Sequence, residues 1–122
     1  MRFNAWLSAL GLVLVPAALL AHHSPSMFGG EERVLTGTVR EFQWSNPHSY
    51  IQLVVEQDDG TQQEWSLEMG GNAYLYNLGW RPSTVKAGDE LTVRIQPLRN
   101  GEPGGLVLEV TTTDGEPVGG HL

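Results

Sequence analysis

The sequence contains no cysteine, which limits the ways in which the chain can be stabilised or anchored. No disulfide can form, and the lipid anchor of bacterial lipoproteins has no residue to which it could be attached. Export to an oxidising compartment remains compatible with this composition, because an exported domain can be stable without disulfides.

Basic residues are scarce as well: seven Lys and Arg stand against 14 Asp and Glu, for a formal net charge of −7. An acidic surface repels the phosphate backbone of nucleic acids, and no basic cluster offsets this charge. The composition therefore argues against a nucleic-acid partner and modestly favours cations as ligands.

Motifs of catalysis are also missing. The sequence has no nucleophile elbow, no phosphate-binding loop, no cysteine pair and no HExxH zinc motif. Since nothing gives positive support to catalysis, the sequence predicts a protein that is not an enzyme.

One apolar run is present, and it is typical of an export signal. Arg2 precedes an almost wholly apolar stretch, Leu7 to Leu20, and the small residue Ala21 suits a cleavage site. The run is shorter than the roughly 20 residues of a membrane-spanning helix. We therefore expect a signal peptide over residues 1–21, a periplasmic or secreted mature protein beginning at His22, and no membrane insertion after cleavage.

The remaining 101 residues suit one domain built mainly of strands. Apolar and polar residues alternate with a period of two in five segments, which is typical of half-buried strands. The segments are Leu35–Arg40, Ile51–Glu56, Glu64–Met69, Leu91–Gln96 and Leu106–Thr111. Between the third and fourth, Asn72 could cap a short helix that Gly79 ends.

Three strands, a helix and two strands follow the order of a Greek-key barrel of the OB type, with the helix at one end of the barrel. The sequence thus predicts an all-β fold, a five-stranded OB-like barrel over residues 33–113, with a five-stranded sandwich as the alternative. A His-containing segment, 22–32, would precede the barrel, with Met27 and Phe28 fastening it, and a flexible tail, 114–122, would follow. The expected interior residues are Leu53, Val55, Leu67, Val93 and Leu108.

Histidines are the candidate metal ligands. Cleavage before His22 would leave a free amine and an imidazole on one residue, and His23 follows directly. A third nitrogen from His48, in the loop between the first two strands, would complete the nitrogen set that suits Cu(II). Copper is the expected metal. Alternatively, the two N-terminal histidines are a remnant of processing, and His48 only supports its turn.

A metal-free alternative is an interaction module for an envelope protein or a glycan. The loops before His48 and between the last two strands would then present Trp44, Asn46 and Asn100 to the partner. An oxidative copper enzyme using the N-terminal histidine is a third class. Other polar residues have plainer roles: Glu64 and Glu68 are expected on a solvated strand face, Met69 in the core, and His121 in a solvated tail.

Several motifs together resemble the bacterial "domain of unknown function 6152" family of small exported proteins. The matching stretches cover nearly the whole mature chain: His22-His23-Ser24, Met27-Phe28, Leu35 to Val39, Phe42 to His48, Glu64 to Gly70, Leu78-Gly79-Trp80 and Pro97 to Gly101. Pro25 and Ala87 depart from the family pattern at peripheral positions. The resemblance implies export and a small β-barrel, and it implies no activity.

Overall fold

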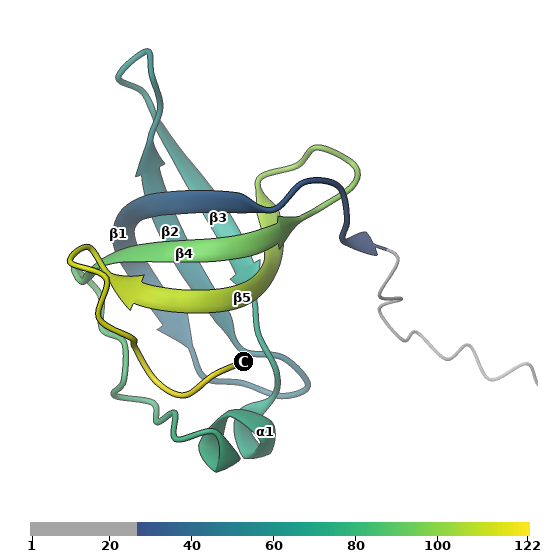
Figure 1. The fold of residues 1–122 in the computed structure, drawn as a ribbon, viewed down its shortest axis with the longest axis vertical. Coiled ribbons are helices and arrows are strands. Elements are labelled where there is room, and N and C mark those ends of the chain that lie inside the picture. The colour runs from purple at the N-terminus through teal and green to yellow at the C-terminus, as the bar shows by residue number, and fades with distance from the viewer. Residues whose placement is uncertain (1–26) are drawn as a thin grey trace, which may run out of the picture.

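The computed structural model describes residues 27–122, and these form a closed five-stranded barrel with one short helix (Figure 1). The expected signal peptide, His22 and His23 lie outside the described residues. The elements are β1 (Arg33–Gln43), β2 (Tyr50–Glu56), β3 (Gln62–Glu68), α1 (Asn72–Asn77), β4 (Glu90–Pro97) and β5 (Gly104–Thr112). Within residues 27–122, no helix is both long enough and apolar enough to cross a membrane.

The strands follow each other around the barrel in the order β1-β2-β3-β5-β4, and β4 pairs with β1 to close it. All neighbours are antiparallel except β3 and β5, which are parallel. The long strand β1 serves both halves of the barrel, because Thr38 pairs with Val54 of β2 and with Glu90 of β4. The expected OB-like architecture is confirmed.

The predicted alternation places interior residues correctly on β2, β3 and β4. Leu53, Leu67 and Val93 are fully buried, and Met69 joins them, whereas Val55 only packs against the edge of the core. Successive side chains of a strand point to opposite faces of the sheet. In a closed barrel one face is the interior, so every second side chain is buried there. Within β3, Trp65 and Leu67 point inward and Glu64 and Ser66 point outward.

On β5 the prediction of Leu108 as an interior residue is wrong. Val107 and Val110 are buried there, and Leu108 is only partly buried. The cause is a β-bulge: Arg94 pairs with Glu109 but the next residue, Ile95, pairs with Val107. The extra residue in β5 shifts the alternation of inward and outward side chains by one position. The sequence of one strand does not show where pairing with its neighbour produces such a bulge.

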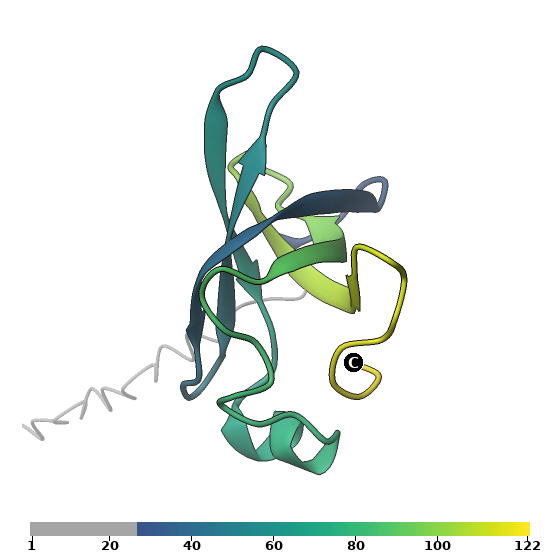
Figure 2. The same cartoon turned by 90° about the vertical axis from the view of Figure 1, so that its left-hand side faces the viewer.

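Helix α1 and the residues after it cover the end of the barrel away from the β2–β3 hairpin (Figures 1 and 2). Leu75 and Trp80 are fully buried there. Gly79 ends the helix with a φ of 90°, as expected, but Asn72 is not the cap. Instead, the backbone N–H of Asn72 donates to Oδ1 of Asn46, 2.9 Å away, so that the β1–β2 loop holds the start of the helix.

Both ends of the described chain are fastened to the barrel. Phe28 forms an isolated bridge with Leu98, and the N–H of Gly29 donates to the carbonyl of Pro97 over 2.9 Å. The segment 114–122, predicted to be a flexible tail, makes specific contacts. Val118 donates its N–H to the carbonyl of Val110, and the Trp80 indole donates to the carbonyl of Gly120. His121 is exposed, as expected.

Candidate functional site

His48 lies in a short loop between β1 and β2 that its own serines hold in shape. The N–H of Ser45 donates to Oγ of Ser49 over 3.2 Å, and Oγ of Ser45 donates to the carbonyl of His48 over 2.6 Å. Ser49 is fully buried, and its backbone bonds to Met69 and Gly70 at the end of β3. The loop is thereby fixed beside the segment that leads into α1.

The imidazole of His48 is oriented by two oxygens of the neighbouring strand. Its Nδ1 lies 3.2 Å from a carboxylate oxygen of Glu68 and 3.3 Å from the carbonyl oxygen of Met69. Both are acceptors, so Nδ1 carries the hydrogen, and the neutral ring then has its lone pair on Nε2. About a third of the His48 side chain is exposed (32%), whereas that of Glu68 is largely covered (11%).

The expectation that Glu68 is solvated is therefore wrong. Glu68 does point away from the core, but it pairs directly with Tyr50 across the ladder, and His48 and Tyr50 cover it. A single strand shows only that Glu68 alternates with apolar residues. The pairing of β2 with β3, which follows once the Asp58-Asp59-Gly60 turn is placed, is the signal that would have found this contact.

Tyr50 completes the cluster by donating its hydroxyl to the second carboxylate oxygen of Glu68, 3.5 Å away. Burial raises the pKa of this phenol, and the negative charge of Glu68 raises it further. The folded state therefore keeps the proton at a pH where the unfolded chain has lost it.

This pKa shift predicts a loss of stability at high pH. The pKa of Tyr50 in the folded state lies above the unfolded value of about 10. The contribution of Tyr50 to folding stability is therefore fully present below about pH 10, and it is lost as the pH rises through the folded-state pKa. Denaturant melts from neutral to strongly alkaline pH should show a smaller loss for Tyr50→Phe than for wild type. Tyr74→Phe, at an exposed position on α1, is the matched control; identical slopes for Tyr50→Phe and wild type would contradict the prediction.

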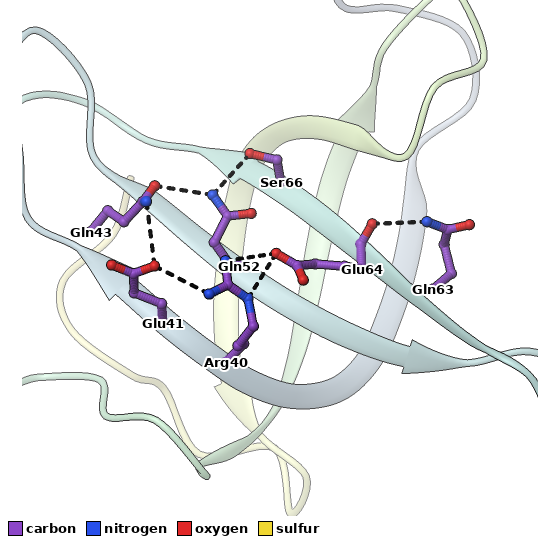
Figure 3. Close-up of polar contacts among 7 residues, drawn as sticks. All are labelled: Arg40, Glu41, Gln43, Gln52, Gln63, Glu64 and Ser66. Carbon is purple, nitrogen blue, oxygen red and sulfur yellow. Dashed lines mark hydrogen bonds and ion pairs between the residues drawn. The ribbon is translucent and has the colours of Figure 1, made fainter.

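The same outer face continues as a row of linked polar side chains across β1, β2 and β3 (Figure 3). The side-chain amide of Gln52, nearly buried at 9% exposure, donates to Oε1 of Gln43 over 3.0 Å and to Oγ of Ser66 over 3.2 Å. Next to it, Arg40 pairs with Glu64 at 2.8 Å and with Glu41 at 3.4 Å. The face thus carries hydrogen-bonding groups held in place by one another.

The predicted partner-loop residues all have contacts within the chain. Trp44 packs against the core and meets Phe42 edge-to-face with ring centroids 6.0 Å apart. Asn46 holds the start of α1, as described above. Oδ1 of Asn100 accepts a hydrogen bond from the N–H of Glu102 and so shapes the β4–β5 loop. Whether these residues also meet a partner remains a prediction.

The structure brings one of the three predicted metal ligands, His48, together with a carboxylate. Among residues 27–122, no group of three or more His, Asp or Glu side chains is placed to hold a metal ion. A metal held at His48 would therefore need ligands from the N-terminal segment or from solvent.

Comparison with known proteins is informative at the level of the family. No curated protein and no solved structure gives a significant match. The model of a family of unknown function, DUF6152, matches residues 10–109, which include β1 to β4, the His48 loop and most of β5. Because this match covers most of the sequence, the chain belongs to the DUF6152 family.

Proposed function

We propose that this protein is an exported, non-enzymatic module that binds a metal ion, copper above all, through His48 together with His22 and His23. The observation that carries the proposal is the environment of the His48 ring. A metal-binding histidine commonly donates its second ring N–H to a carboxylate or a backbone carbonyl, which fixes the tautomer and makes the ligand nitrogen more basic. Glu68 and Met69 provide both kinds of acceptor for Nδ1.

The position of the N-terminal anchor is compatible with a shared site. Phe28 is three strand-to-strand spacings away from β3. Phe28 pairs with Leu98, Leu98 donates its N–H to the carbonyl of Gly104, and Gly104 pairs with Ser66 of β3. At about 4.8 Å per spacing, these three steps amount to roughly 14 Å measured along the sheet. His22 precedes Phe28 by six residues, which span about 20 Å when extended. A shared site therefore requires the segment from His22 to Phe28 to run toward β3.

The ligand set favours Cu(II). A terminal amine, the imidazole of the same residue and a facing imidazole supply three nitrogens in the arrangement that suits tetragonal copper, whereas zinc commonly takes a fourth protein ligand. Each nitrogen must be unprotonated to bind. Since a terminal amine titrates near pH 7.7–8.0 and an imidazole near 6.5, affinity should rise between about pH 6 and pH 8.

The N-terminal ligand is tested by moving it. Protein exported by its own host should begin at His22 in intact-mass measurements without chelators. Calorimetry with Cu(II) should then show at least about tenfold weaker binding when one alanine is added before His22, because the terminal amine and the imidazole of His22 are then on different residues. Alanine added after Leu122 is the control. A mature start elsewhere, or unchanged affinity with the N-terminal addition, would refute the chelate.

A further inference from the structure

A groove on the outer face of the barrel is separate from the His48 cluster. It has a volume of about 410 Å³ and lies between the first half of β1 and the β2–β3 hairpin. Its lining includes Thr36, Thr38, Arg40, Val54, Glu56 and Gln62. Arg40 also belongs to the polar row of Figure 3, so it joins the groove to that row, in which Gln43, Gln52 and Ser66 are linked by hydrogen bonds.

We propose that this groove and the adjoining row bind a short, neutral oligosaccharide. The position agrees with the fold, because OB barrels commonly bind their ligands on the face formed around strands 2 and 3. The proposal does not depend on a metal: none of its contact residues is a proposed copper ligand.

The chemistry of the lining fits a sugar. Sugar hydroxyls both donate and accept hydrogen bonds, and the groove and row offer both kinds of partner: threonine and serine hydroxyls, glutamine amides, a guanidinium and carboxylates. Several of these groups already hold each other in position. Gln52 is fixed by two hydrogen bonds and Arg40 by two ion pairs, so binding would order few side chains and cost little entropy.

Charge and apolar content separate a sugar from other ligands. The one guanidinium, Arg40, is already paired with Glu41 and Glu64, which leaves no unbalanced positive charge for a phosphate or another polyanion. Protein–protein interfaces usually rely on buried aromatic or arginine anchors in apolar surroundings. Two valines line the groove: Val39 is buried, and Val54 is flanked by hydroxyl, amide and charged groups. A small, uncharged polyol matches this surface best.

The test is a titration of ¹⁵N-labelled protein, followed by NMR in the presence of EDTA so that metal binding plays no part. Cellotetraose, maltotetraose and chitotetraose are the probes. At least one should give saturable shifts confined to Thr36–Arg40, Val54 and Gln62, together with the side-chain amides of Gln43 and Gln52. The affinity should not change between low and high salt, because the ligand carries no charge.

Variants then separate the groove from the rest of the surface. Thr38→Val keeps the shape of the side chain but removes the hydroxyl, so it should weaken binding about fivefold, as expected for one hydrogen bond. Thr113→Val, at an exposed position beyond β5, is the matched control and should bind like wild type. Thermal melts establish that each variant is folded.

Two results would overturn the proposal. The first is the absence of saturable shifts with all three tetrasaccharides at concentrations on the order of 10 mM, which corresponds to negligible affinity. The second is tight binding of a tetralysine peptide at the same residues that disappears at high salt. That result would assign the groove with Glu56, and the adjoining carboxylates of Glu41 and Glu64, to a basic peptide instead.

Discussion

Replacing Leu67 with alanine should lower the free energy of unfolding by about 2–5 kcal/mol. Leu67 lies near the end of β3 and is fully buried in the barrel core, and its partner across the ladder, Ile51, is also fully buried. Deleting its isobutyl group both loses apolar burial and leaves a cavity, because a closed barrel of paired strands can relax only slightly around it. Denaturant melts at neutral pH measure the change.

Glu64→Ala is the matched control on the same strand. The Glu64 side chain points outward and is 43% exposed, and its ion pair with Arg40 is at the surface. Since exposed ion pairs contribute roughly 0–1 kcal/mol, the loss should stay below about 1 kcal/mol. Equal losses for the two variants would mean that the inner and outer faces of β3 have been assigned wrongly.

Replacing His48 with alanine should weaken Cu(II) binding by at least about tenfold, or roughly 1.4 kcal/mol, at pH 7. An N-terminal His22 would provide the amine and one imidazole in the unfolded chain as well. A site that depends on folding must therefore contain a ligand that the fold brings in, and we propose His48 as that ligand. Calorimetry of the mature protein measures the effect, and thermal melts with EDTA establish that the variant remains folded.

Two further variants sharpen this test. His121→Ala should leave the affinity unchanged, because His121 lies in the C-terminal segment and is exposed. Glu68→Gln should weaken binding by about tenfold or more, because the carboxylate that orients the His48 ring becomes neutral. If His48→Ala binds copper as tightly as wild type, no folded metal site exists, and a metal-free interaction module becomes the better interpretation.

The sequence by itself determined the class of the fold and the order of its strands and helix along the chain. A period of two marks the five strands, because a strand with one face inside must alternate its side chains. The Asp58-Asp59-Gly60 turn and Gly79 mark chain reversals and a helix end that require particular backbone angles. These are local constraints, and Leu53, Leu67 and Val93 were accordingly placed correctly in the core.

Only the tertiary structure decided which residues meet. The bulge that exchanges Leu108 for Val107 depends on the register between β4 and β5. The contact of His48 with Glu68, and the support of α1 by Asn46, join residues far apart in the chain. Such contacts depend on strand order and on barrel closure, which are collective properties of the packed chain. Periodicity shows which way a side chain points, and only packing determines which side chain it meets there.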